Sequence, residues 1–264
     1  MAHKLQTALI TGPTSGIGKE FSWQLAQLGC NLVLVSRSED ILVEMCQDLA
    51  KQYGVEAQVI VADLEKSGEP ERVFEKVRSL DLDVDLLINN AGTQVYAPFN
   101  EASWEGTQTL MDLNVKAVVH LTHLFLPGML QRDRGHILNI GSTASFVPGP
   151  NNAVYCAGKA FILSFSLAIA EELRGSNVGV TCLCPGIVDT PFVDKAGLND
   201  TVIMKLTAMD PEPVAAAGIR AVQRGKWVHI PGWINKITMF LQRFVPRRLI
   251  TRVAKWALLP PRYR

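Results

Sequence analysis

The stretch ALITGPTSGIGKEF, residues 8–21, determines how this chain begins to fold. Its apolar start predicts a buried strand, its end begins a segment of helical period, and glycines at positions 12, 16 and 18 lie between the two. Glycine permits tight turns and close backbone approach to a ligand, and a helix N-terminus offers free N–H groups and the positive end of its dipole. The spacing is GxxxGxG rather than GxGxxG, and glycine-rich turns also occur as plain connectors. Its place directly after a strand favours a turn that holds a pyrophosphate.

Apolar, β-branched runs alternate with segments of helical period along most of the chain. The expected strands are residues 7–10, 31–36, 57–63, 84–92, 135–142, 177–186 and 226–231. The expected helices are residues 17–28, 39–53, 68–80, 105–130, 154–174 and 211–224. This alternation is typical of repeated βαβ units. It predicts a single doubly wound, Rossmann-type α/β domain with a seven-stranded parallel sheet flanked by helices.

The composition is that of a globular protein, because 48% of the 264 residues are apolar and 19% are charged. We expect one domain over residues 1–229 and a C-terminal extension over residues 230–264. The first apolar run starts at residue 5, and no uninterrupted apolar stretch is long enough to span a bilayer, so we expect neither a signal peptide nor a spanning helix. The five cysteines have no metal-ligand spacing, which indicates buried thiols and a cytoplasmic protein.

The extension is basic and amphipathic. Residues 1–212 contain 15 lysines and arginines and all 25 acidic residues, whereas residues 213–264 contain 11 basic residues and no acidic one. Pro246 divides the extension into two expected helices. In the second, the basic residues lie on one face and apolar residues on the other: Arg248, Arg252 and Lys255 against Leu249, Ile250, Val253, Trp256 and Ala257. We expect one of three roles for such a helix: it binds an anionic membrane surface peripherally, it covers the substrate cleft, or it contacts a second subunit.

Ser36 and Arg37 follow the second expected strand, where dinucleotide folds recognise the adenosine ribose. A carboxylate there suits an unmodified ribose, while a guanidinium and a hydroxyl suit a 2'-phosphate. The pair therefore favours NADP(H) over NAD(H). The alternative is that Arg37 pairs on the surface with nearby Glu39 or Asp40.

Tyr155 and Lys159 lie four residues apart in AVYCAGKAF, residues 153–161, and so share one face of an expected helix. At about 5 Å and an effective dielectric near 20, an ammonium favours the phenolate by about 3 kcal/mol, or roughly two pKa units. That shift would prepare Tyr155 for proton transfer near neutrality, although burial acts in the opposite direction. Taken alone, the same spacing also fits a solvated helix face.

Several motifs together make the chain resemble the short-chain dehydrogenase/reductase family over roughly residues 5–230. They are TGPTSGIG at 11–18, NNAG at 89–92, Asn114 in LNVKA, Ser142 in ILNIGSTAS, Tyr155 and Lys159 in YxxxK, and PGIVDTP at 185–191. Their order and spacing agree, including the 13 residues from Ser142 to Tyr155.

This resemblance implies a catalytic set of four residues. Tyr155 would exchange a proton with the carbonyl or alcohol oxygen, and Lys159 would lower the pKa of Tyr155 and bind the nicotinamide ribose. Ser142 would position the oxygen, and Asn114 would hold a water molecule that links Lys159 to solvent. Singly, Ser142 also fits a turn serine and Asn114 an amide inside a helix.

The resemblance also implies a set of cofactor-binding residues: Gly12, Thr14, Ser15, Gly16, Ile17, Gly18, Ser36, Arg37, Asp63, Leu64, Asn90, Ala91, Gly92, Tyr155, Lys159, Pro185, Gly186, Val188 and Thr190. Asp63 would contact the adenine, although it also fits a helix cap. Ile187 or Val188 would reach the carboxamide through its backbone, and Thr190 the phosphates.

The substrate is expected to contact Ser142, Phe146, Tyr155 and Phe192. Residues 144–154 and 191–203 contain no arginine for a carboxylate or phosphate, which favours a hydrophobic ketone or aldehyde. Among enzymes, a 3-oxoacyl thioester reductase is the alternative. A non-catalytic NADP(H)-binding sensor or scaffold is the alternative, since a fold alone does not fix a function. We expect no metal and no nucleic-acid partner, because neither kind of motif is present. The apolar helices at 105–130 and 154–174 favour a homodimer or homotetramer.

Overall fold

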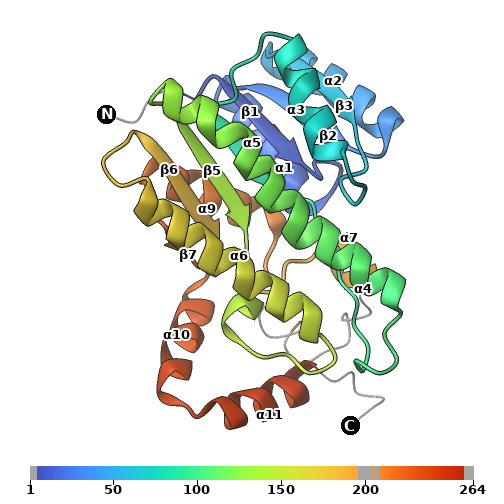
Figure 1. Cartoon of the computed structure of the whole chain (residues 1–264), viewed down its shortest axis with the longest axis vertical. Helices are drawn as coiled ribbons and strands as arrows, with labels where there is room; N and C mark the ends of the chain where they lie inside the picture. The colour runs from blue at the N-terminus through green and yellow to red at the C-terminus, as the bar shows by residue number, and fades with distance from the viewer. Residues whose placement is uncertain (1–4, 196–203, 205–207, 259–264) are drawn as a thin grey trace.

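A central parallel sheet organises the molecule (Figure 1). The computed structural model describes residues 5–195, 204 and 208–258. The sheet order is β3-β2-β1-β4-β5-β6-β7, and every neighbouring pair is parallel. The strands are β1 Thr7–Thr11, β2 Asn31–Ser36, β3 Ala57–Val61, β4 Leu86–Asn89, β5 Gly135–Ile140, β6 Val178–Leu183 and β7 Val228–His229. The predicted seven-stranded Rossmann-type sheet is confirmed.

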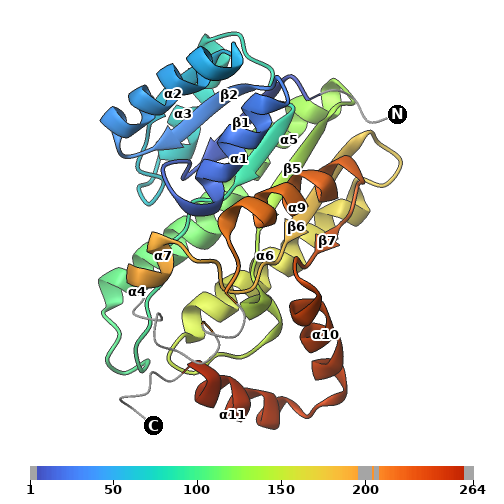
Figure 2. The ribbon, with the colours of Figure 1, turned by 180° about the vertical axis from the view of Figure 1, so that it is seen from behind.

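Helices cover both faces of this sheet and extend beyond it at the C-terminal side. They are α1 Gly16–Gln27, α2 Glu39–Tyr53, α3 Glu69–Ser79, α4 Trp104–Met111, α5 Ala117–Gln131, α6 Ala153–Glu172, α7 Pro191–Lys195, α9 Pro211–Gln223, α10 Trp233–Leu241 and α11 Arg247–Leu258. Figure 1 shows α3, α5 and α6 on one face of the sheet, and Figure 2 shows α1, α2 and α9 on the other.

The first strand shows why the sequence requires two covered faces. All five residues of β1 are buried, and successive side chains point to opposite sides of the sheet. Ala8 and Ile10 belong to the core under α1, α2 and α9, while Leu9 belongs to the core under α3, α5 and α6. A continuous apolar run is therefore the strand pattern expected of a parallel sheet.

The segment predicted as one helix over 105–130 is divided. Between α4 and α5 the chain forms a π-helical turn over Asp112–Lys116, which contains Asn114. A π turn inserts a residue into the helical register and is frequent at functional sites. The sequence has no glycine or proline in this turn that would have indicated it.

Two continuous helical segments, Trp104–Gln131 and Ala153–Glu172, are apolar and long enough to cross a membrane by length and composition alone. The sequence did not predict these segments as candidates to span a membrane, because neither of them is an uninterrupted apolar run. Both segments contribute to the core beside the sheet, through Phe125 and Ile162 among others, as core helices of globular proteins do.

The strand order places the binding loops. The chain leaves β1 toward β2 on one side and returns to β4 on the other, so the order reverses between β1 and β4. In open parallel sheets, ligands bind at the carboxyl ends of the strands beside such a switch point. The glycine turn after β1 and the NNAG segment after β4 meet at this position.

Candidate active site

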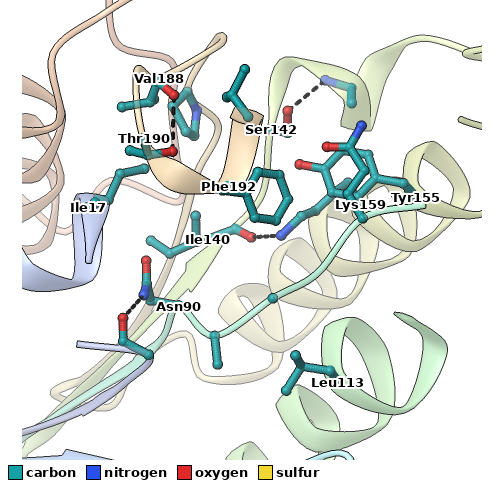
Figure 3. A pocket seen from close by; sticks show the side chains of 18 of the residues that line it. Ile17, Asn90, Leu113, Ile140, Ser142, Tyr155, Lys159, Val188, Thr190 and Phe192 are labelled. Atoms are coloured by element: carbon teal, nitrogen blue, oxygen red, sulfur yellow. Dashed lines mark hydrogen bonds between the residues drawn. The ribbon is translucent and has the colours of Figure 1, made fainter. Parts of the chain in front are cut away.

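A cavity of about 470 Å³ opens at the carboxyl edge of the sheet. It brings together most of the residues predicted from the sequence (Figure 3). These are Gly12, Thr14, Ser15, Gly16, Ile17, Ser36, Arg37, Asp63, Leu64, Asn90, Ala91, Gly92, Ser142, Tyr155, Lys159, Pro185, Gly186, Val188, Thr190 and Phe192. Gly18, Asn114 and Phe146 do not line the cavity wall.

The glycine turn requires glycine for conformation and for space. Gly12 and Gly16 have φ values of +65° and +54°, in the left-handed region. A Cβ atom at Gly12 would lie 3.0 Å from Ala91 Cα, and one at Gly16 would lie 2.7 Å from Thr190 Cγ2. Gly18 supports the turn from behind, where a Cβ would collide with the carbonyl oxygen of Gly12.

The turn leads into the N-terminus of α1, and the N-cap Ser15 makes no side-chain hydrogen bond to the helix. The first backbone N–H groups of α1 therefore face a concave glycine surface without a side-chain acceptor. Free N–H groups, the positive end of the helix dipole and the close backbone approach together fit a dinucleotide pyrophosphate.

Asn90 ties the turn to the loop after β4. Its Nδ2 donates to the carbonyl oxygens of Thr11 and Gly12, both at 2.9 Å. The Thr11 hydroxyl in turn accepts from the backbone N–H groups of Asn90 and Ala91, both at 3.0 Å. This network joins the ends of two neighbouring strands, so Asn90 shapes the groove rather than pointing freely into it.

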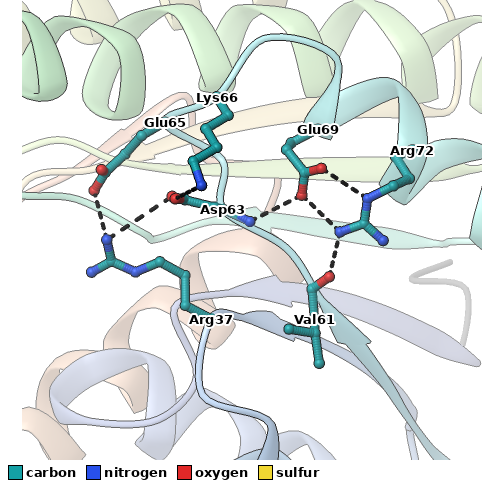
Figure 4. Close-up of polar contacts among 7 residues, drawn as sticks. All are labelled: Arg37, Val61, Asp63, Glu65, Lys66, Glu69 and Arg72. Atoms are coloured by element: carbon teal, nitrogen blue, oxygen red, sulfur yellow. Dashed lines mark hydrogen bonds and ion pairs between the residues drawn. The ribbon is translucent and has the colours of Figure 1, made fainter.

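The ribose end of the groove contains a charged cluster (Figure 4). Arg37, whose side chain is 64% exposed, donates to Glu65 Oε1 at 3.1 Å and lies 3.9 Å from Asp63 Oδ1. Arg37 therefore pairs with Glu65 rather than with Glu39 or Asp40, the partners considered from the sequence. Asp63 Oδ1 is buried with no hydrogen-bond partner among the described residues, which leaves an acceptor available to an adenine amino group.

Tyr155 and Lys159 lie on α6 and face the cavity (Figure 3). Lys159 Nζ lies 5.7 Å from the centre of the Tyr155 ring. The ammonium donates a hydrogen bond to the carbonyl oxygen of Ile140 at 2.7 Å, while the phenol points toward Ser142. The Phe192 ring lies 6.1 Å from the Tyr155 ring and covers it from the side of α7.

Burial dominates the proton affinities of this pair. It raises the pKa of Tyr155 far above its ordinary value, although a hydrogen bond with Ser142 lowers that pKa in part. Burial also lowers the pKa of Lys159 to about 8. The expected lowering of the Tyr155 pKa by Lys159 is therefore not what this structure shows. The ammonium is directed at Ile140, and desolvation disfavours the charged form of both groups.

The Ser142 loop is fixed to the catalytic helix through Ser145. Ser142 is the N-cap of a 3₁₀ turn, Thr143–Phe146, and its hydroxyl accepts from the N–H of Ala144 at 3.1 Å. The Ser145 hydroxyl accepts from the N–H of Ser142 at 3.2 Å and donates to the carbonyl oxygen of Lys159 at 2.8 Å. Ser145 thus links the backbones of two predicted catalytic residues, a role that its sequence motif did not reveal.

Asn114 lies behind the cavity wall and is 1% exposed. Its side chain accepts from the N–H of Thr93 and donates to the carbonyl oxygen of Thr93, both at 2.8 Å. Both polar side-chain atoms are therefore engaged with backbone. That Asn114 holds a water molecule, as the resemblance implies, stays a prediction.

The substrate side of the cavity is apolar and includes residues that the sequence did not indicate: Leu113, Met239, Ala254 and Ala257. Met239 belongs to α10, and the two alanines belong to α11, so the C-terminal extension closes one wall. The expectation that Phe146 contacts the substrate is wrong, because its side chain packs against the core cluster that contains Val118 and Ile162. The neighbouring Val147 lines the cavity instead.

Among the residues that the structure describes, no group of histidine, cysteine or acidic side chains forms a metal site. All five cysteines are buried and free. Cys182 and Cys184 lie on the same side of the β6 end with their Sγ atoms 3.6 Å apart, which confirms the interpretation of these residues as packed thiols.

A groove built for a pyrophosphate beside a tyrosine, a lysine and a serine is the arrangement of a dinucleotide-dependent oxidoreductase. The family model of the short chain dehydrogenases matches residues 6–200. The chain belongs to the short-chain dehydrogenase family and is an oxidoreductase that interconverts CH–OH and C=O groups with a nicotinamide dinucleotide.

The chain is similar to two kinds of curated relative. It is 37% identical over 218 residues to a very-long-chain 3-oxoacyl-CoA reductase of Laccaria bicolor, covering 81% of this chain and 62% of that protein. It is also 30% identical over 234 residues to an uncharacterized oxidoreductase of Staphylococcus saprophyticus, covering 89% of this chain and 96% of that protein. The chain thus spans less than two thirds of the fungal relative.

Solved structures give the same result for the fold. A structure of a 7β-hydroxysteroid dehydrogenase superposes with a TM-score of 0.86 at 28% identity, covering 95% of this chain and 97% of that one. A short-chain dehydrogenase from Sphingobium yanoikuyae in complex with NADPH superposes with a TM-score of 0.81 at 29% identity, covering 92% and 97%.

Proposed function

We propose that this oxidoreductase uses NADP(H) to interconvert a hydrophobic ketone or aldehyde and its alcohol, with Ser142, Tyr155 and Lys159 as its catalytic residues. The observation that carries the proposal is one continuous cavity that joins the glycine groove to an apolar wall. Tyr155 and Ser142 line this same cavity.

The residues divide the chemistry of carbonyl reduction among them. The bound nicotinamide supplies the hydride. Burial keeps Tyr155 protonated at neutral pH, so its hydroxyl can give a proton to the carbonyl oxygen as negative charge develops there. The Ser142 hydroxyl orients that oxygen, and the Lys159 ammonium stabilises the tyrosinate left after the transfer.

The preference for NADP(H) rests on Arg37. Its guanidinium lies at the ribose end of the groove beside Ser36 and is exposed enough to turn toward a 2'-phosphate. Glu65 and Asp63 compete for the same cation, so we propose that the preference is moderate.

The substrate class rests on the cavity wall. Leu113, Val147, Phe192 and Met239 present apolar side chains to it, which disfavours small polar substrates. Relatives named for a 3-oxoacyl-CoA and for a hydroxysteroid agree with a large apolar carbonyl compound. A 3-oxoacyl thioester is the narrower candidate.

The C-terminal arm, residues 230–258, supports a peripheral membrane contact as well as a lid. Helix α11 covers the cavity with Ala254 and Ala257. Several large aromatic side chains of the arm are exposed, namely Trp233, Phe240, Phe244 and Trp256. On the amphipathic helix α11, Trp256 and the basic residues Arg248, Arg252 and Lys255 are exposed, which favours an anionic bilayer surface. Sedimentation with anionic vesicles, with and without residues 230–264, tests this contact.

We also propose that the protein forms a homodimer or homotetramer through α5 and α6. Large apolar side chains on these helices, including Leu130, Phe161 and Leu167, are exposed in the single chain. Light scattering coupled to size exclusion would give a single chain mass if this proposal is wrong.

Oxidation of NADPH measured against a panel of carbonyl compounds tests the function. We expect the catalytic efficiency, kcat/KM, to rise with the apolar surface of ketones and 3-oxoacyl thioesters. Higher efficiency with small sugars or charged aldehydes than with apolar ketones would contradict the substrate class. Equal efficiency with NADH would contradict the cofactor preference.

A further inference from the structure

A second hollow, of about 340 Å³, lies where α9, β7 and the start of α10 meet. Its positively charged lining consists of Arg220 on α9, Arg224 and Lys226 in the connection after α9, and Lys236 on α10, with His229 of β7 beside them. The stretch 213–264, which supplies these cations, contains no acidic residue. Residues of the catalytic cavity do not line this hollow.

None of the four cations takes part in an ion pair among the described residues. Arg220 lies in the last turn of α9, and Arg224, four positions later, is the C-cap of this helix, so both guanidinium groups are presented on one side. Like charges that surround a concave surface repel one another and concentrate a positive potential inside it. Burial lowers the pKa of His229, and the positive charges of Lys236, Lys226, Arg220 and Arg224 lower it further. His229 therefore lies within the positive potential of the hollow.

We propose that this basic hollow binds a phosphate-bearing anion, either a soluble phosphate compound or a phospholipid headgroup. Two arginines offer paired N–H donors that match phosphate oxygens, and two lysines add point charges from other directions. The hollow is roomier than one phosphate requires, which suits a phosphate ester or a diphosphate. A bound anion also removes the repulsion among the four cations.

The position of Lys236 gives the anion a structural consequence. Lys236 lies on α10, whereas Arg220 lies on α9 and Arg224 directly follows α9, so a bound anion bridges the C-terminal arm to the core domain. Asn235 on α10 donates to the carbonyl oxygen of Pro231 at 3.1 Å and packs against Gly186 of the cavity wall. Occupancy of the basic hollow should therefore fix α10, which carries Met239 into the catalytic cavity.

The first test uses inorganic pyrophosphate and follows the His229 ring by NMR in the full-length protein, with the signal assigned from a His229→Gln variant. This readout is local, so pyrophosphate bound in the glycine groove does not interfere. We expect the pKa of His229 to rise as pyrophosphate binds, because the anion offsets the surrounding positive charge. In the double variant Arg220→Gln/Arg224→Gln, we expect the affinity to fall at least about tenfold.

A matched control separates a site from general charge. Arg243→Gln/Arg248→Gln removes the same charge from exposed positions of the arm outside the basic hollow. This control should bind pyrophosphate within about twofold of the parent protein. Equal weakening in the two double variants would show only diffuse attraction and would overturn the proposal.

The second test identifies the source of the phosphate. Vesicles of phosphatidylcholine with phosphatidic acid present a phosphomonoester headgroup, and co-sedimentation measures binding. Tighter vesicle binding that depends on Arg220 and Arg224 more than on Arg243 and Arg248 assigns the hollow to a lipid headgroup. Binding of pyrophosphate without such vesicle dependence assigns it to a soluble anion. Absence of both effects would overturn the proposal.

Discussion

The Lys159 ammonium donates a hydrogen bond to the carbonyl oxygen of Ile140 at 2.7 Å, and only 7% of the lysine is exposed. Ile140 ends β5, so this bond fixes the catalytic helix α6 to the edge of the sheet. A cation at this depth is costly, because burial lowers the pKa of Lys159 to about 8. The stabilisation that Lys159 can offer a tyrosinate is therefore maintained at the expense of fold stability.

The first prediction follows from that lowered pKa. The pKa of Lys159 is 10.5 in the unfolded chain and about 8 in the folded protein, so between these values the unfolded chain binds more protons. The free energy of unfolding, relative to a Lys159→Met variant, should therefore rise by about 3 kcal/mol as the pH increases from 8 to 10.5. Urea unfolding of both proteins across this range measures the difference. A difference that stays constant with pH would show that the buried amine does not titrate there.

The second prediction concerns the phenol. Tyr155→Phe removes the proton donor but keeps the ring against Phe192, so turnover should fall by about 10² to 10⁴ while NADPH affinity changes by less than about threefold. Fluorescence titration and single-turnover reduction separate the two effects. Tyr53→Phe is the control, because Tyr53 packs edge-on against Trp23 away from the cavity. Unchanged turnover in Tyr155→Phe would exclude Tyr155 as the proton donor.

The third prediction concerns a buried histidine. His136 contacts Thr181 Oγ1 at 2.8 Å, and burial lowers the pKa of His136 to about 4. The pKa of His136 is 6.5 in the unfolded chain, so the stability that the neutral ring contributes is complete above pH 6.5. The free energy of unfolding should therefore fall by about 3 kcal/mol as the pH drops from 6.5 to 4. A His136→Gln variant should lack this part of the pH dependence. The exposed His123→Gln control should keep it, and loss in both variants would point to another group.

Local patterns sufficed for the fold and for the framework of the site. The runs around Leu9 and Ile10 had to be buried on both sides, and the glycines at 12 and 16 had to form a turn with positive φ. Sequence spacing also predicted that Tyr155 and Lys159 share one face of a helix. These features depend on neighbours within a few residues, which a sequence displays directly.

The remaining features depend on contacts between distant segments. The balance between burial and charge at Tyr155 depends on where the Lys159 ammonium points, which spacing does not encode. Met239 lines the cavity only because the chain turns back after β7. The partner of Arg37 is Glu65 from the loop after β3, since parallel strands bring that loop beside the end of β2.

The last prediction follows from the Arg37 and Glu65 pair. A 2'-phosphate must draw the Arg37 guanidinium away from Glu65 Oε1, 3.1 Å away, before both of its donors can bind. Removing the carboxylate charge with Glu65→Gln should therefore raise NADPH affinity by about two- to fivefold, while NADH affinity changes by less than about twofold. Arg37→Met should do the reverse and weaken NADPH at least about tenfold. Titration of each variant with both cofactors measures this, with Glu39→Gln as a control that removes a nearby carboxylate that makes no ion pair with Arg37 among the described residues. Equal gains for NADPH and NADH in Glu65→Gln would mean that Arg37 does not recognise the 2'-phosphate.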